Sequence, residues 1–405
     1  MIETVLEGPA NLDTSPILTR DLPDASESSL RPRLIGRIQG SPGEPTLLCL
    51  GSTHGNEPSG TLALERIFTA LEQDPTGLQG ELVGLVGNRR ALAAGQRFLE
   101  NDLNRYWQPE RVERLRTSDG NGLEAEDAEL FELDREINKV LAQATGEVFA
   151  MDLHTTSGLG PCFVVLDDSL KNREQALHVP STVVVGLEEE LSGTVTHHLA
   201  DLGVTVFGFE AGQHDDPTSV DRAEAAIWIT LESSGVLAVG CRPEPELGRQ
   251  MLAQDRGSLP PVVEVRYRHA VRPQDGFEMA PGFINFQPVH IGLLLATDRH
   301  GDVRATRKGL ILMPLYQKQG ADGFFVVRPL QALWLGLSAK IRRGHWERFI
   351  HLLPGVKRNP DRPNSFVVDR KWARFLAPEL FHLLGYRRSG SANDRFLVMT
   401  RRTEE

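Results

Sequence analysis

Two segments of the sequence carry histidine and carboxylate side chains at spacings suited to metal binding. In Gly51-Ser-Thr-His-Gly-Asn-Glu57, which follows an apolar run, His54 and Glu57 stand three residues apart at a turn and can face one point. His154 ends a second apolar run in the same way. Two imidazoles and one carboxylate suit Zn²⁺ and leave a position for water, as hydrolytic zinc sites require. The pattern predicts a metal site, although each motif alone also fits a solvated loop pair or a hydrogen-bonded histidine.

Hydrolysis at a metal also needs a general base, and Glu210 is the best candidate. It follows a third apolar run in Phe207-Gly-Phe-Glu-Ala-Gly-Gln213, among small residues that leave room for a substrate. A carboxylate near a metal in a partly desolvated cleft can take a proton from water. A carboxylate that caps the next helix or pairs with an arginine fits the spacing equally well.

Arginines cluster before the second of these motifs. Arg97, Asn104 and Arg105 lie in one short stretch, a few residues after Asn88-Arg-Arg90. Guanidinium groups bind carboxylates through paired hydrogen bonds, and an arginine near a polarised carbonyl stabilises a developing oxyanion. Asn104 and Arg105 are adjacent and together could hold one substrate carboxylate. The alternative is a helix end with ordinary surface salt bridges.

The pattern from residue 34 to residue 229 predicts an α/β sheet that would position these side chains. Short β-branched or apolar runs alternate there with longer segments of helical composition. The expected strands are Thr46–Leu50, Leu82–Val86, Val148–Asp152, Cys162–Leu166, Thr182–Val185 and Val204–Phe209, and the expected helices are Ser59–Leu71, Ala125–Ala144 and Ser219–Ser234. Because open α/β sheets bind ligands at the carboxyl ends of their strands, the candidate residues sit where chemistry is expected.

The rest of the chain differs in composition. The runs Val262–Val271, Phe283–Phe286, Gly292–Thr297 and Gly309–Met313 predict strands joined by turns. From Leu335 to Glu405, 15 Lys and Arg stand against 7 Asp and Glu, and apolar residues at helical spacing between Trp346 and Leu353 and between Trp372 and Leu383 predict short helices. We expect a catalytic domain in residues 1–241, a small β domain in residues 258–334 and a basic, short helical C-terminal appendage in residues 335–405.

Composition and charge exclude several classes of function. The 405 residues have a net charge of −11, which argues against unspecific nucleic-acid binding because that requires a surplus of Lys and Arg. No apolar run approaches the ~18 residues of a membrane-spanning helix, and the first residues do not resemble a secretory signal. The three cysteines are far apart and suggest neither a disulfide framework nor a cysteine zinc site. We expect a cytoplasmic enzyme without nucleic-acid or membrane partners. The sequence leaves the oligomeric state open, a homo-oligomer included.

Taken together, the motifs resemble the succinylglutamate desuccinylase/aspartoacylase family, a branch of the carboxypeptidase-like zinc hydrolases. The shared motifs, in the family's order, are G-x-x-H-G-N-E at Gly51–Glu57, an arginine followed by D-L-N-R at Arg97 and Asp102–Arg105, D-L-H-T at Asp152–Thr155 and E-x-G at Glu210–Gly212. Further likeness at Gly193–His197 and Arg266–Pro288 extends the match over residues 45 to 330.

The resemblance implies both a fold and a set of residue roles. The fold would be a mixed, mostly parallel sheet with helices on both faces, as in the zinc carboxypeptidases, with the small all-β domain capping the active site. One Zn²⁺ per chain would be held by His54, Glu57 and His154, and Glu210 would activate the water and later protonate the leaving amine. The remaining implied roles are polarisation of the scissile carbonyl by Arg97, carboxylate binding by Asn104 and Arg105, orientation of their loop by Asp102 and support of the metal site by Asp152.

The implied activity is zinc-dependent hydrolysis of the amide bond of a small anionic N-acyl amino acid. A metallocarboxypeptidase acting on a peptide C-terminus and a non-catalytic binding protein on the same fold are the alternatives. The sequence also departs from the aspartoacylase branch, in which an additional arginine precedes the catalytic glutamate. Thr194–Phe209 contains no arginine, so His197 and His198 are the candidates to replace it, and Tyr316 is the candidate for a substrate-contacting tyrosine of the cap.

Overall fold

The computed structural model describes residues 30–187, 190–330, 332–344, 355–359, 365–369, 386–393 and 396–400. An eleven-stranded sheet lies at its centre, with the strand order β1-β3-β2-β4-β7-β5-β6-β8-β14-β13-β10. These strands are β1 (Leu34–Gln39), β2 (Thr46–Gly51), β3 (Glu81–Val86), β4 (Val148–Thr156), β5 (Phe163–Val165), β6 (Thr182–Val185), β7 (Thr205–Gln213), β8 (Val262–Ala270), β10 (Pro288–Val289), β13 (Gly309–Leu312) and β14 (Asp322–Pro329). Strands β3, β2, β4 and β7 run parallel to one another, and the expected mixed, mostly parallel sheet is confirmed.

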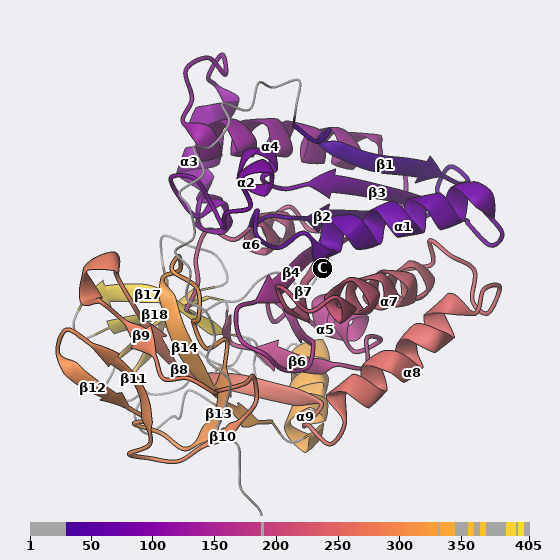
Figure 1. The fold of residues 1–405 in the computed structure, drawn as a ribbon. Coiled ribbons are helices and arrows are strands. Elements are labelled where there is room, and N and C mark those ends of the chain that lie inside the picture. Colours follow the sequence, from indigo (N-terminus) through magenta and orange to yellow (C-terminus); the bar gives the residue numbers. More distant parts are fainter. Residues whose placement is uncertain are drawn as a thin grey trace, which may run out of the picture.

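Helices cover this sheet on both sides (Figure 1). They are α1 (Ser59–Gln73), α2 (Arg89–Ala94), α3 (Pro109–Arg116), α4 (Ala125–Gln143), α5 (Leu170–Ala176), α6 (Val195–Asp201), α7 (Thr218–Ser233) and α8 (Glu244–Arg256), with the 3₁₀ turns η2 (Leu103–Arg105) and η4 (Pro273–Asp275). Strand β2 shows how the layers arise, because all six of its residues are buried. Leu47 and Cys49 pack into one core with α1 and α7, whereas Leu48 and Leu50 pack into a second core with α3, α4 and α6. Alternate side chains of the strand thus serve opposite helix layers.

The expected β segment after residue 258 continues this sheet. Strand β8 pairs with β6, so the main sheet runs across residue 258, and β14, β13 and β10 follow it. A separate three-stranded sheet contains β9 (Glu278–Met279), β11 (Leu294–Asp298) and β12 (Gly301–Arg304). The expected strand Phe283–Phe286 was wrong: the chain turns there, and Phe286 has a φ of 66°, which lies outside the extended region.

The C-terminal segment is helical only at its start. Helix α9 (Ala332–Arg343) buries Arg342, whose Nη2 donates to the carbonyl oxygen of Asp168 at 2.8 Å. The later described residues form a four-stranded antiparallel sheet of β15 (Val356–Arg358), β16 (Ser365–Asp369), β18 (Phe396–Thr400) and β17 (Arg387–Asn393). The expected short helical appendage was therefore wrong for these residues, because runs such as Ser365-Phe-Val-Val-Asp369 favour strands. The runs Trp346–Leu353 and Trp372–Leu383 lie outside the described residues.

Candidate metal centre and active site

The loop between β2 and α1 holds His54 and Glu57 in a fixed, crowded backbone. Ser52 adopts a φ of 55°, and its hydroxyl lies 2.7 Å from that of Thr61 in α1. Gly55 leaves no room for a side chain, because a Cβ there would lie 2.0 Å from the carbonyl carbon of Ala91. Glycine is therefore required where the loop passes α2, and this close packing turns both candidate ligands toward one point.

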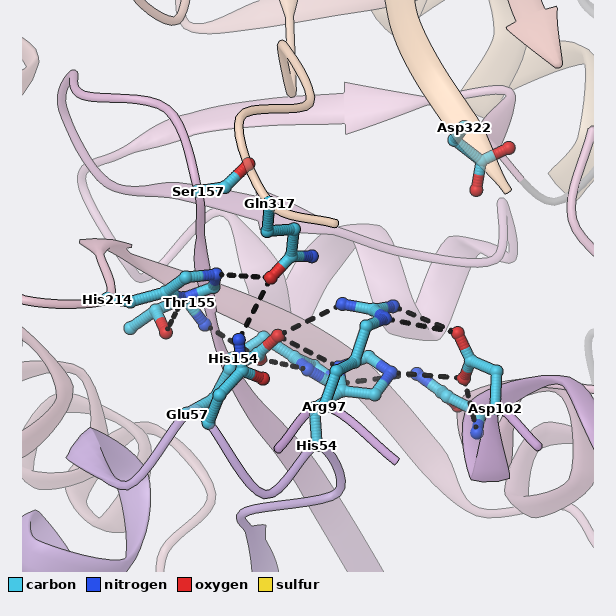
Figure 2. A network of polar contacts seen from close by, with 12 residues as sticks. His54, Glu57, Arg97, Asp102, His154, Thr155, Ser157, His214, Gln317 and Asp322 are labelled. Atoms are coloured by element: carbon cyan, nitrogen blue, oxygen red, sulfur yellow. Dashed lines mark hydrogen bonds and ion pairs between the residues drawn. The ribbon is translucent and has the colours of Figure 1, made fainter. Parts of the chain in front are cut away.

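His54, Glu57 and His154 come together as the sequence predicts (Figure 2). Nδ1 of His54 lies 3.0 Å from Oε1 of Glu57, and Nδ1 of His154 lies 2.9 Å from Oε2 of the same carboxylate. All three side chains are buried, and one ligand atom from each lies within 4.8 Å of the others. This group could hold a metal ion, and its donor set of two imidazoles and a carboxylate is one that Zn²⁺ accepts.

Two further carboxylates orient the imidazoles. Nε2 of His54 lies 3.1 Å from Oδ1 of Asp102, and Nε2 of His154 lies 2.6 Å from Oδ2 of Asp152. Asp152 is itself held by the hydroxyl of Thr53 at 2.7 Å. Since a carboxylate accepts hydrogen bonds, Asp102 and Asp152 favour a proton on each Nε2, and with a metal ion at the shared point each Nδ1 would offer its lone pair to the ion. This is the arrangement in which metal-ligating histidines occur, so the residues present fit a metal ion.

The electrostatics of the group favour a cation. Burial opposes charge on His154, but Asp152 and Glu57 outweigh it and hold the pKa of His154 well above its ordinary value. Burial likewise opposes ionisation of Glu57, but His54 and His154 outweigh it and hold the pKa of Glu57 well below its ordinary value. The buried carboxylates thus attract positive charge, which protons supply here and which a metal ion would supply instead.

Arg97 lies beside the ligands and remains charged. Its Nη1 donates to Oε1 of Glu57 at 3.2 Å, and its Nη2 donates to Oδ2 of Asp102 at 3.1 Å. Burial opposes the charge, but Asp102 and Glu57 outweigh it and raise the pKa of Arg97. Asp102 benefits in turn, because Arg97 and His54 outweigh its burial and hold its pKa well below the ordinary value.

A glutamate that the sequence did not single out positions the loop carrying Arg97 and Asp102. Glu126 in α4 is buried and accepts hydrogen bonds from the backbone N–H groups of Leu99, Glu100 and Asn101 at 2.7, 3.0 and 3.2 Å. An acidic residue in the first turn of a helix ordinarily faces solvent and the helix dipole, so nothing in its sequence context distinguishes Glu126.

Asn104 and Arg105 take different positions in the structure. The side chain of Asn104 points to the metal ligands: Nδ2 lies 3.5 Å from Oδ2 of Asp152 and 3.3 Å from Nε2 of His154, and Oδ1 accepts from Val195 N at 2.9 Å. Arg105 donates through Nη1 to the carbonyl of Asn104 at 2.8 Å and through Nη2 to Asp322 at 2.9 Å. Of the two, Arg105 keeps further N–H groups for a ligand.

Glu210 lies in β7 at the register position opposite His154 of β4. Beyond it β7 bulges, and Gly212 supports the bulge with a φ of 116°. Glu210 is buried, and its Oε2 has no hydrogen-bond partner among the described residues. Burial raises the pKa of Glu210 to about 8, and Glu57 adds to the rise, while His154 and Arg97 act against it. The site therefore contains a carboxyl oxygen without a protein partner and with a pKa near neutrality.

A cavity of about 130 Å³ connects these residues. One side includes His54, Glu57, Arg97, Arg105, His154 and Glu210, and the other side includes Met313, Gln317 and Asp322 from the β segment. His197, His198 and Tyr316 do not line it. The Tyr316 hydroxyl instead donates to the carbonyl of Ala280 at 2.9 Å. Besides Glu126, sequence reasoning thus missed Thr53, Gln317 and Asp322, each of which acts through a partner distant in the chain.

Comparison with known proteins agrees with the resemblance seen in the sequence. Residues 43–230 match the family model of the succinylglutamate desuccinylase/aspartoacylase catalytic domain. The resemblance seen in the motifs is confirmed for these residues. The match supports a hydrolase of the succinylglutamate desuccinylase/aspartoacylase type. No curated protein matches it significantly.

Solved structures share the fold. A succinylglutamate desuccinylase/aspartoacylase from Rhodobacter sphaeroides superposes with a TM-score of 0.54 at 17% identity, over 73% of this chain and 88% of that one. The product-bound ectoine utilization protein EutE (DoeB) from Ruegeria pomeroyi gives 0.51 at 20% identity, over 72% and 87%. A succinylglutamate desuccinylase from Vibrio parahaemolyticus gives 0.51 at 16% identity, over 73% and 85%. Among the helices that the structure describes, none has the length and apolarity of a membrane span.

Proposed function

We propose that this protein is a zinc-dependent deacylase that hydrolyses the amide bond of a small anionic N-acyl amino acid, giving a carboxylate and a free amino acid. The observation that carries the proposal is the unpartnered, buried Oε2 of Glu210 in the same cavity as the His54, Glu57 and His154 group. The matched family of hydrolases supports the same reaction class.

His54, Glu57 and His154 would hold one Zn²⁺ per chain. When bound, such an ion acts as a Lewis acid toward the amide carbonyl and makes water easier to deprotonate. Asp102 and Asp152 keep the two imidazoles in the tautomer that offers Nδ1 to the ion. Thr53 fixes Asp152 through a hydrogen bond, so the orientation of His154 extends into the sheet.

Glu210 would act as the general base and then as the general acid. Its Oε2 faces no protein donor, so it can accept the proton of an attacking water. Burial raises the pKa of Glu210 to about 8, near the range in which a carboxyl group both takes and returns a proton. The same carboxyl would then protonate the leaving amine.

Arg97 and Arg105 would bind the two oxygens that carry negative charge. Arg97 keeps its charge through Asp102 and Glu57 and lines the cavity, so it can stabilise the oxyanion that forms from the amide carbonyl. Arg105 lines the same cavity and would hold the substrate carboxylate. Asn104 contributes to this subsite through its backbone carbonyl, which accepts from Arg105, and its side chain supports Asp152.

We also propose that residues 258–334 act as a cap and residues 1–241 as the catalytic domain. Met313, Gln317 and Asp322 line the cavity from the cap side. A cavity closed in this way favours a small substrate over a peptide C-terminus, which distinguishes the deacylase from a metallocarboxypeptidase.

The test is a deacylation screen of zinc-loaded protein with N-acetyl, N-formyl and N-succinyl amino acids, read out as free amine, together with metal analysis. We expect about one zinc per chain and amine release by the wild type. Glu210→Gln should keep the metal and lower kcat by at least about a hundredfold. Glu100→Gln is the matched control, because it changes an exposed carboxylate in the loop between Arg97 and Asp102. It should change neither the metal content nor kcat. Loss of metal in Glu210→Gln would contradict its role as the base.

A further inference from the structure

Among the residues that the structure describes, no basic side chain lines the cavity from the cap side. The described cap residues that line it are Met313, Leu315, Gln317, Gly320, Ala321, Asp322 and Phe325. On the catalytic side, Arg97 and Arg105 are the guanidinium groups among the described lining residues, and no lysine joins them. Apart from a metal ion, the positive charge that a substrate meets therefore comes from these two arginines. Its size depends on the protein carboxylates that they already contact.

Both arginines are partly neutralised by protein carboxylates. Arg97 forms ion pairs with Glu57 and Asp102, so its positive charge is largely balanced within the candidate metal centre. Arg105 contacts Asp322 at 2.9 Å, and the same carboxylate accepts from Nε of Arg268 at 2.5 Å. The trio of Arg105, Arg268 and Asp322 thus carries one net positive charge, which balances one substrate carboxylate and not two.

Gln317 supplies a neutral polar group on the cap side. Its Oε1 accepts two hydrogen bonds from the catalytic domain, from Nδ2 of Asn56 at 2.9 Å and from Nε2 of His214 at 3.1 Å. Figure 2 shows Gln317 reaching from the cap toward His214, close to Thr155 and the metal ligands. In the structure, the oxygen of the Gln317 amide faces both of these nitrogens.

With the Gln317 amide in this orientation, the hydrogen-bond chain has a single direction. Because an amide oxygen only accepts, Nε2 of His214 carries the proton and Nδ1 of His214 accepts from the hydroxyl of Thr155 at 2.7 Å. Burial lowers the pKa of His214, which agrees with a neutral ring. The direction of the chain is therefore Thr155 to His214 to Gln317.

The amide nitrogen of Gln317 is left as a donor in the cavity. In Figure 2 this nitrogen is turned away from His214, to the side of Arg97. No described residue accepts a hydrogen bond from it, although Gln317 lines the cavity. A preoriented N–H pair without a protein partner suits an uncharged oxygen of a ligand, such as an amide or acyl carbonyl.

We propose, on the basis of the deacylase function above, that the substrate is an N-acyl amino acid with a single carboxylate and a neutral oxygen acceptor. Arg105 binds the carboxylate and the amide of Gln317 binds the neutral oxygen. A second carboxylate, in the acyl group or in the side chain, finds no uncommitted arginine and meets Asp322. Gln317 is thus a specificity-determining residue, and His214 and Asn56 are its positioning residues.

The test compares two nearly isosteric compounds, N-acetylglutamine and N-acetylglutamate. Hydrolysis is measured in the zinc-loaded wild type, and binding is measured by calorimetry in the zinc-loaded Glu210→Gln variant. We expect the wild type to favour the glutamine derivative at least about tenfold in kcat/KM. Gln317→Ala should lower kcat/KM for the glutamine derivative about threefold to tenfold, mainly through KM, because one neutral hydrogen bond is lost. Gln317→Lys should shift the preference toward the glutamate derivative.

Tyr316→Phe is the matched control, because Tyr316 adjoins Gln317 but directs its hydroxyl to Ala280 outside the cavity. It should leave the ratio of the two kcat/KM values unchanged. A wild type that treats both compounds alike or prefers the glutamate derivative would overturn the single-carboxylate assignment. Unchanged kinetics and binding in Gln317→Ala would overturn the assignment of Gln317.

The binding measurement separates this inference from the proposed function. If the wild type hydrolyses neither compound while Glu210→Gln binds the glutamine derivative at least about tenfold more tightly, the deacylase function fails and the subsite assignment stands. If neither compound is bound or hydrolysed, both fail.

Discussion

The two sides of the cavity are built in different ways. On the catalytic side, the ligand atoms of His54, Glu57 and His154 are buried, and each imidazole has its own carboxylate partner. On the cap side, Gln317 and Asp322 are half-buried. Their contacts reach the catalytic side through Asn56, His214 and Arg105.

This difference separates chemistry from selectivity. A buried metal ligand with fixed charged partners cannot be removed without loss of the metal or of stability, because an uncompensated charge would remain inside. A half-buried group can change while the protein remains folded, because water replaces the lost partner. Substitutions on the catalytic side should therefore abolish activity, whereas substitutions on the cap side should redirect it.

The largest effect is expected for the metal ligands. His154→Ala removes a proposed metal ligand and one partner each of Asp152 and Glu57. Zinc affinity should fall by well over about a hundredfold, because even loss of a residue that only orients a ligand costs about tenfold to a hundredfold. Zinc titration with a competing chelator measures this directly. Gln317→Ala serves as the cap-side counterpart and should keep the wild-type affinity. Equal zinc loss in both variants would break the distinction between the two sides.

The support of the catalytic side should also depend on pH. Glu129 in α4 is fully buried and contacts Arg33 and, at 2.6 Å, Arg90. Burial alone would raise its pKa, but Arg33 and the backbone N–H of Arg89 outweigh burial and lower the pKa of Glu129 below the ordinary 4.5. A lowered pKa in the folded state means that this stabilisation is present above the unfolded-state value and is lost as the pH falls through the folded-state value.

Glu129→Gln should consequently lower the free energy of unfolding by about 3 kcal/mol at pH 7. The difference from the wild type should shrink as the pH falls below 4.5, the ordinary pKa of a glutamate. Urea unfolding at several pH values measures both effects. Glu132→Gln changes a more exposed partner of Arg33 and should cost less than about 1 kcal/mol. A pH-independent difference for Glu129→Gln would show that the lost interaction is not ionic.

The sequence was sufficient for the parts of the site that are encoded in short motifs. His54, Glu57, His154 and Glu210 could be placed together because each lies near or just beyond the carboxyl end of a strand, and parallel strands bring these ends to one edge. The helices α1, α4 and α7, which pack on the sheet, could be predicted as well, since their segments have clear helical composition. Local patterns of apolar residues determine these elements, and no long-range information is needed.

The parts that were missed depend on contacts between distant segments. Glu126 binds a loop 25 to 27 residues earlier in the chain, and Gln317 contacts Asn56 across 261 residues. The periodic pattern of apolar residues in a sequence does not indicate such contacts between distant residues. The C-terminal sheet was missed for a different reason. Strands such as β15 and β16 are too short to show the alternation of apolar and polar residues that indicates a strand, and neighbouring segments have apolar residues at helical spacing.

The smallest expected effect sharpens the comparison most, because it changes selectivity without touching the metal side. Asp322→Asn removes the carboxylate between Arg105 and Arg268, so the net charge of this group rises from one to two. Hydrolysis of N-acetylglutamate relative to N-acetylglutamine should therefore increase, by up to about fivefold because these side chains remain partly exposed and water screens part of the charge. The ratio of the two kcat/KM values measures the shift, and raised salt should reduce it. Asp302→Asn, at an exposed cap position, should leave the ratio unchanged. A ratio that stays constant in Asp322→Asn would mean that Asp322 only holds the cap in place, and selectivity would then reside in the catalytic side alone.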